Sequence, residues 1–190
     1  MIEKTYLGLI LIFFILAFAI RNIKTYISTK KSIRGKSLKL TISVLISTII
    51  YCLILLRLTL LKSKFLFEID LPTGINIIGL VFVSVGFILG ILSLSVMKNS
   101  WRVGIKYDQK TELITTGIYR ISRNPYFLSY DILIFGYILI FTSPILIILY
   151  LILVIVFHKM ILEEEKYLQS VHDAAYEDYK RKVSRYLTIN

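Results

Sequence analysis

The chain has 190 residues, of which 56% are hydrophobic, and its mean hydropathy is +0.74. Soluble domains are usually about 45–50% apolar, and here the excess lies in long runs, so an ordinary soluble domain is excluded. The composition predicts an all-α, polytopic membrane protein. The net charge is +11, and the charged residues lie between the apolar runs. We therefore assign the positive charge to loops beside anionic lipid and expect no nucleic-acid partner.

Five apolar segments are predicted to cross the bilayer, at about residues 5–20, 40–61, 74–97, 127–141 and 145–157. The first also resembles a signal peptide. Because Arg21 and Asn22 follow it, with no small-residue cleavage pattern, we expect an uncleaved span. In the third span, Gly86 and Gly90 are typical of close helix packing rather than of a binding loop.

The last two spans are predicted to form a tight helical hairpin. Residues 127–157 would make a helix of about 46 Å, against roughly 30 Å of hydrocarbon. Thr142, Ser143 and Pro144 lie in the middle and favour a turn. One helix kinked at Pro144 is the alternative.

Basic side chains predict the orientation of the spans. Residues 21–39 hold seven Lys or Arg and no acid, and the segments 98–126 and 158–190 are also basic. Five spans place all three on one side, which we expect to be the cytoplasm. The N-terminus would face outward, with a loop carrying Lys62, Lys64, Glu68 and Asp70. We therefore expect one membrane domain, 1–190, with its C-terminus in the cytoplasm.

The hairpin should bring two polar segments to the same membrane face. Residues 158–183 are predicted to form a helix with one apolar face made of Ile161, Leu168, Val171, Ala175 and Tyr179. Glu163, Glu164 and Glu165 open this segment, and a solvated helix start is the simplest explanation for them. In the other segment, Asn124 fits the N-cap of the following helix and Pro125 its first turn. Neither role explains Gly117, Tyr119 and Arg123.

The chain resembles the isoprenylcysteine carboxyl methyltransferase family and its phospholipid methyltransferase relatives over roughly residues 101–186. The first shared pattern consists here of Leu113, Ile114, Gly117, Tyr119, Arg123, Asn124, Pro125, Tyr126 and Phe127. The second consists of Glu164, Glu165, Leu168, Tyr176, Tyr179, Lys180, Arg181, Lys182 and Val183. The family has His at the position of Asn124 and Tyr at that of Phe127. The Asn variant resembles bacterial members, so we expect a bacterial or archaeal cell membrane.

The resemblance implies methyl transfer from S-adenosylmethionine to a lipid-embedded or prenylated substrate, with carboxylate O-methylation as one form. It implies a cofactor site made of Glu112, Leu113, Ile114, Tyr119, Arg123, Asn124, Pro125, Phe127, Glu164 and Glu165. A carboxylate can accept from the cofactor ammonium or ribose, and aromatic rings can face the sulfonium. Arg123 could hold the cofactor carboxylate, or it could be an interfacial Arg whose head reaches water.

Substrate contacts are expected from Arg102, Asp131 and Met160. Met160 stands where eukaryotic enzymes of the family carry an Arg. Asp131 lies inside the fourth span, where an acid is a functional candidate and could act as a base. The alternative is an interfacial ion pair of Asp131 with Arg102 or Arg123. We expect no metal site, because neither His158 nor His172 has a partner at ligand spacing.

Two other functions fit the same layout of spans. One is an NADPH-dependent membrane reductase of the steroid-reductase type, and the other is a non-enzymatic membrane protein on this scaffold. The pair Glu164 and Glu165 favours the cationic methyl donor over NADPH.

Overall fold

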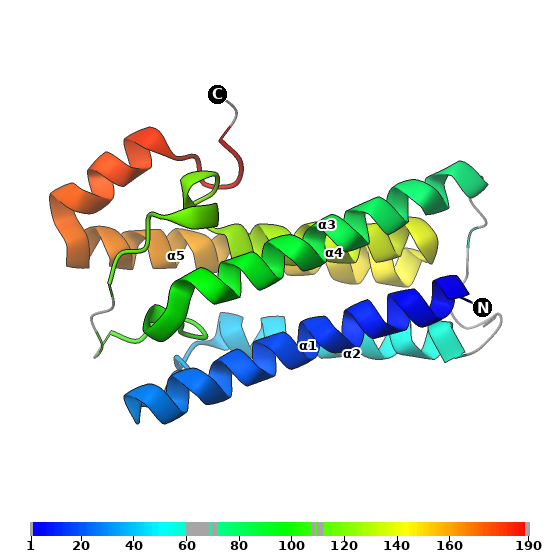
Figure 1. Cartoon of the computed structure of the whole chain (residues 1–190), viewed down its shortest axis with the longest axis horizontal. Coiled ribbons are helices and arrows are strands. Elements are labelled where there is room, and N and C mark those ends of the chain that lie inside the picture. Colours follow the sequence, from blue (N-terminus) through cyan, green and yellow to red (C-terminus); the bar gives the residue numbers. More distant parts are fainter. Residues whose placement is uncertain (1, 60–68, 70–71, 108, 110–111, 189–190) are drawn as a thin grey trace.

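The computed structural model describes residues 2–59, 69, 72–107, 109 and 112–188. Its α-helices are α1 (Ile2–Thr29), α2 (Leu38–Thr59), α3 (Thr73–Met97), α4 (Pro125–Ile140) and α5 (Pro144–Lys182) (Figure 1). Four of them are long and apolar enough to cross a bilayer, and α4 is a shorter apolar helix. The 16 residues of α4 span about 24 Å. The predicted all-α, polytopic membrane class is confirmed.

Helix ends differ from the predicted spans where polar residues prolong a helix. α1 continues to Thr29, beyond the apolar run that ends at residue 20, because charge ends a hydrophobic stretch without breaking a helix. α2 begins at Leu38, and the end of the predicted second span, residues 60 and 61, lies outside the described residues. So does the predicted outer loop with its charged residues, Lys62, Lys64, Glu68 and Asp70.

The predicted hairpin is present, and the alternative of one kinked helix is wrong. α4 ends at Ile140 and α5 begins at Pro144, so three residues reverse the chain. The amide of Phe141 donates to the Tyr137 carbonyl at 2.8 Å and closes the last turn of α4. Pro144 occupies the first turn of α5, where its missing N–H costs no helical hydrogen bond.

α3 and α4 lie side by side with their backbones in close contact, because glycines face the interface. A Cβ on Gly86 would lie 2.5 Å from the amide nitrogen of Leu133, and one on Gly136 would lie 2.6 Å from that of Val83. Gly90 faces the ring of Phe14 on α1 in the same way. Gly86 and Gly90 therefore serve helix packing, as expected.

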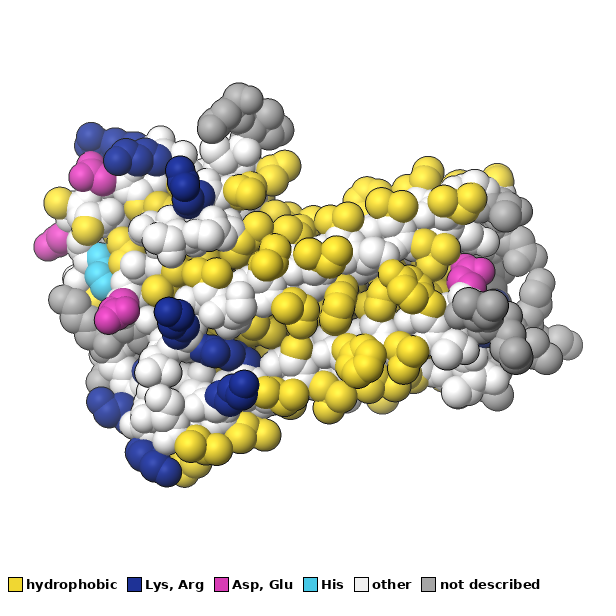
Figure 2. Space-filling model, viewed as in Figure 1, with side chains coloured by type: hydrophobic (Ala, Val, Ile, Leu, Met, Phe, Trp, Pro, Cys, Tyr) yellow, Lys and Arg dark blue, Asp and Glu magenta, His cyan; other side chains and the backbone are white. Residues whose placement is uncertain are grey.

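Three segments that are distant in the sequence meet at one end of the molecule. The connection between α1 and α2 pairs with the segment after α3, since Gly35 N donates to Val103 O at 2.8 Å. α5 joins them there through an ion pair between Lys39 and Glu163. Lys and Arg side chains gather at this end, while hydrophobic side chains cover the long helical body (Figure 2). The predicted convergence of the two polar segments is thus seen in the fold.

α5 changes direction beyond its apolar part. Its uncharged stretch ends at Phe157, and the helix continues past the three acids to a kink at Asp173 (φ 46°, ψ −120°). The segment after the kink folds back over residues 112–124 (Figure 1). The kink resets the helical periodicity, so Tyr176 is buried while Ala175 is exposed. The predicted apolar face is wrong at Ala175 for this reason.

Candidate functional site

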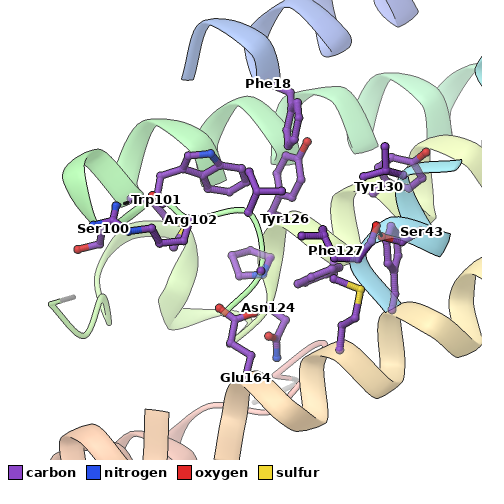
Figure 3. A pocket seen from close by; sticks show the side chains of 18 of the residues that line it. Phe18, Ser43, Ser100, Trp101, Arg102, Asn124, Tyr126, Phe127, Tyr130 and Glu164 are labelled. Atoms are coloured by element: carbon purple, nitrogen blue, oxygen red, sulfur yellow. Dashed lines mark hydrogen bonds between the residues drawn. The ribbon is translucent and has the colours of Figure 1, made fainter. Parts of the chain in front are cut away.

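A cavity of about 550 Å³ runs from the polar end of the molecule into the helical body (Figure 3). This volume lies within the range usual for small-molecule sites. Its walls come from α1, α2, the segment between α3 and α4, the start of α4, and α5. One cavity therefore connects the motif residues with the apolar interior.

Eleven of the predicted site residues line this cavity: Arg102, Glu112, Leu113, Ile114, Tyr119, Arg123, Asn124, Pro125, Phe127, Met160 and Glu164. Glu165 and Asp131 are not among the lining residues. In Figure 3, Glu164 and Asn124 lie at one side of the pocket, while Phe127, Ser43 and Tyr130 lie toward α2.

The three consecutive acids of α5 have three different surroundings, because successive helical residues point about 100° apart. Glu163 pairs with Lys39 at the start of α2. Glu164 lines the cavity. Glu165 is 8% exposed and forms an ion pair with Arg123 at 2.9 Å. The explanation that these acids are simply solvated residues at the start of a helix therefore does not hold for Glu164 or Glu165.

The environment of Glu164 favours its neutral form. Burial raises the pKa of this carboxyl to about 7, and the adjacent Glu165 charge acts in the same direction. Burial, with the nearby Glu164 charge, also raises the pKa of Tyr119, so that hydroxyl stays protonated. A cation that enters the cavity would therefore meet a carboxyl ready to ionise at neutral pH.

Glu165 is the centre of a buried polar cluster. Arg185 donates to both of its carboxylate oxygens, from Nη2 at 2.9 Å and from Nε at 3.1 Å. Asn124 Nδ2 donates to it at 3.4 Å. Burial alone would raise the pKa of Glu165, but the hydrogen bonds and charges of Arg185 and Arg123 hold that pKa below its usual value. Glu165 thus fixes the loop against α5, and its predicted contact with a cofactor stays a prediction.

Asn124 is the N-cap residue of α4 by position, but its side chain does not cap the helix. It turns instead to Glu165 and to the carbonyl of Arg185, at 3.2 Å. The predicted N-cap position is therefore confirmed, while the side-chain amide serves the buried cluster instead of the helix end. Arg185, which no motif pattern indicated, is the residue that sequence reasoning missed here.

The other motif residues now have structural roles. Gly117 has φ +60°, a conformation that favours glycine, and it opens the 3-10 turn η3 (Gly117–Arg120). The carbonyl of Tyr119 accepts a hydrogen bond from Tyr179 Oη at 2.6 Å. Leu113 packs against the buried cluster of Tyr176, Tyr179 and Val183. The folded-back end of α5 thereby holds the loop that lines the cavity.

The interior half of the cavity is aromatic and was not predicted. The ring of Tyr126 packs edge-on against Trp101, with centroids 5.0 Å apart, and stacks with Phe18. α2 adds Ser43, Ser47 and Tyr51 to the wall. Within the apolar run of α2, these three residues look like ordinary packing residues. The only sequence signal that they share one face of the helix is their spacing of four positions.

Asp131 lies on α4 away from the cavity. Its Oδ1 is buried and has no hydrogen-bond partner among the described residues. The expected ion pair with Arg123 is not formed, because Arg123 binds Glu165 instead. Arg102 donates to Gln109 Oε1 at 2.9 Å. The structure therefore gives Asp131 no contact with the candidate site.

These features define a polytopic helical membrane protein whose cavity joins a polar end to the apolar interior. Residues 75–175, more than half of the chain, match the phospholipid methyltransferase family. The chain belongs to this family of integral membrane methyltransferases, and the resemblance to the isoprenylcysteine carboxyl methyltransferase group is confirmed. A search of curated proteins gives no match.

Proposed function

We propose that the protein transfers a methyl group from S-adenosylmethionine to an acceptor embedded in the bilayer. The observation that carries this proposal is the single cavity in which Glu164 and the motif loop meet the aromatic interior. A water-soluble donor can occupy the polar end while a lipid occupies the apolar end. Family membership supports methyl transfer as the reaction class.

The residues at the polar end fit the parts of this cofactor. Glu164 can accept from its ammonium or ribose hydroxyls. Arg123 lines the cavity, so its guanidinium, which also pairs with Glu165, can hold the cofactor carboxylate. Residues 112–114 line the cavity, and their backbone groups can bind the adenine edge. Tyr119 and Phe127 provide ring surfaces for the adenine or for the sulfonium.

The cofactor supplies an electrophilic methyl group, so the chain itself needs no nucleophile. In-line displacement requires the acceptor atom and the methyl carbon to be aligned and about 3–3.5 Å apart. The protein therefore contributes mainly by positioning the two reactants. The aromatic rings of Trp101 and Tyr126, which pack edge-on beside the cavity, can face a cationic sulfur. We assign no proton transfer to Asp131, because it does not line the cavity.

Ligand titration of the purified protein in detergent tests the proposal. S-adenosylmethionine and its demethylated product should raise the temperature of unfolding, because they bind the native state. NADPH should not raise it, because NADPH has no cationic group for Glu164 to bind. A shift with NADPH alone would overturn the proposal in favour of a reductase, and no shift with any ligand would favour the non-enzymatic alternative.

We also propose that the polar end faces the cytoplasm, which is where the cofactor is found. The basic segments at this end support that orientation. Ser170 is exposed on α5, and a Ser170→Cys variant in a Cys52→Ser background offers one label site. An impermeant maleimide should react with it in inverted vesicles and not in intact cells. The reverse pattern would overturn the orientation.

A further inference from the structure

Residues 184–188 lie against the loop that precedes α4 and are joined to it through the backbone. The amide of Arg123 donates to the Ser184 carbonyl at 3.1 Å, and the amide of Thr188 donates to the Ile121 carbonyl at 2.8 Å. The two segments therefore run in opposite directions, as neighbouring antiparallel strands do. We call residues 184–188 the clasp.

Side chains of the loop add two hydrogen bonds to the clasp. Ser122 Oγ donates to the Arg185 carbonyl at 3.3 Å, and Asn124 Nδ2 donates to the same carbonyl at 3.2 Å. Both Ser122 and Asn124 are buried, so losing these partners would cost free energy. Arg123 and Asn124 also line the cavity. The clasp therefore sets where two cavity-lining residues stand.

One hydrogen bond ties the clasp to the part of α5 that leaves the apolar body. Tyr186 Oη and His158 Nδ1 lie 2.6 Å apart, and the two rings stack with their centroids 6.1 Å apart. Burial raises the pKa of Tyr186, so its hydroxyl stays protonated and can donate to Nδ1 of a neutral His158. His158 directly follows Phe157, where the uncharged stretch of α5 ends. The pair thus fastens the returning chain to a helix that crosses the bilayer.

Polar contacts, rather than helix formation, hold the clasp in place. α5 ends before the clasp begins, and the side chains of Ser184 and Leu187 are exposed. Arg185 supplies one anchor through its ion pair with Glu165, and Tyr186 supplies a second. Loss of either anchor should loosen the loop that the clasp holds.

Neither Tyr186 nor His158 lines the cavity. A ligand in the cavity meets Arg123 and Asn124, and the Tyr186–His158 pair reaches that ligand only through the clasp. We propose that Tyr186 and His158 are positioning residues, which hold the clasp so that Arg123 and Asn124 face the cofactor. The inference rests on the proposed function for the identity of that cofactor.

Removal of the Tyr186–His158 hydrogen bond tests this role. Tyr186→Phe and His158→Phe each keep an aromatic ring and lose the hydrogen bond. Each variant should weaken S-adenosylmethionine binding about two- to tenfold, as measured by isothermal titration in detergent. The double variant should weaken it no more than either single variant, because both changes remove the same bond. Additive losses, or single variants with wild-type affinity, would overturn the inference.

Hydrogen exchange of the cofactor-free protein tests the clasp itself. The amides of Arg123 and Thr188 are bonded between the clasp and the loop, so peptides that contain them should exchange about two- to tenfold faster in Tyr186→Phe. Peptides from the contact between α3 and α4 should exchange as in the wild type. Unchanged exchange at Arg123 and Thr188 refutes the inference. This measurement needs no ligand, so it is independent of the proposed function, which fails if the wild type binds no S-adenosylmethionine.

Tyr6→Phe is the matched control for a general loss of stability. The hydroxyl groups of Tyr6 and Ser84 lie 2.7 Å apart and join α1 to α3, and neither residue lines the cavity. This variant also removes one tyrosine hydrogen bond, but it should keep the wild-type affinity for S-adenosylmethionine. Equal losses of affinity in Tyr6→Phe and Tyr186→Phe would show a general effect and contradict the positioning role.

Discussion

Glu164 and Glu165 are neighbours in the sequence, but the pKa values of their carboxyl groups are shifted in opposite directions. Burial beside a second carboxylate raises the pKa of Glu164 to about 7. Arg185 and Arg123 hold the pKa of Glu165 below its usual value. The carboxyl with the raised pKa faces the cavity, and the carboxyl with the lowered pKa fixes the surrounding loop. This division of roles underlies the first four predictions.

Replacing Glu164 should abolish most cofactor binding without unfolding the protein. Glu164→Gln removes a charge that can accept from the cofactor ammonium, a contact worth about 1.5–3 kcal/mol. The Kd for S-adenosylmethionine should therefore rise by about ten- to a hundredfold. Isothermal titration in detergent measures it. Glu163→Gln is the matched control, since Glu163 pairs with Lys39 outside the cavity, and equal loss in both variants would contradict the assignment.

Cofactor affinity should depend on pH through Glu164. Below pH 7 this carboxyl is largely protonated in the free protein, so binding a cation requires loss of that proton. Affinity should increase up to about tenfold per pH unit below 7 and level off above it. Titrations between pH 5.5 and 8.5 would show this rise, and Glu164→Gln should flatten it. A wild-type affinity that falls with pH over this range would refute the role of Glu164.

Arg185 should stabilise the fold through Glu165. Arg185→Gln leaves the buried carboxylate with Arg123 as its remaining ionic partner, so the free energy of unfolding should fall by about 1–3 kcal/mol. Chemical unfolding in detergent measures the change. Arg181→Gln, at an exposed position in the last turn of α5, should change it by less than about 0.5 kcal/mol.

The same cluster predicts how stability responds to acid. The folded-state pKa of Glu165 is depressed, so its contribution is present above the ordinary carboxyl pKa and is lost as pH falls through the folded value. Arg185→Gln should therefore destabilise the protein at neutral pH and have a smaller effect in strong acid. An undiminished effect of Arg185→Gln in acid would show that the ion pair is not its cause.

The contact between α3 and α4 should not tolerate a side chain. An alanine Cβ at Gly86 would lie 2.5 Å from a backbone nitrogen of α4, so the helices would have to separate. Gly86→Ala should cost about 1–3 kcal/mol in unfolding free energy. Gly74→Ala, where a Cβ meets nothing within 4 Å, should be neutral or stabilising. Equal effects at the two positions would contradict the packing account.

The sequence was sufficient for the helices and for most of the charged residues that line the cavity. Uncharged runs and the turn at Pro144 predicted the spans and the hairpin, because the bilayer permits few alternatives. The kink at Asp173 could not be predicted, since it depends on contacts that the end of α5 makes with residues 112–124. Helical periodicity therefore failed only beyond the kink.

The part of the cavity inside the membrane was missed for a chemical reason. Ser47 and Tyr51 are common in packed transmembrane helices, where hydroxyls bond to the helix backbone or to neighbours. Whether they line the cavity depends on which face of α2 turns toward it, and composition does not reveal that. Arg185 was missed because Glu165 was assigned to the cofactor, which left no expected partner for an Arg in the tail.

Exposed residues line the cavity both at its polar end and on α2. Glu112, at the polar end, and Cys52, on α2, are both exposed lining residues. A ligand that fills one end leaves the other accessible. The two reactants of a methyl transfer could then bind and depart in either order, and kinetics with both varied should fit random addition rather than a compulsory sequence.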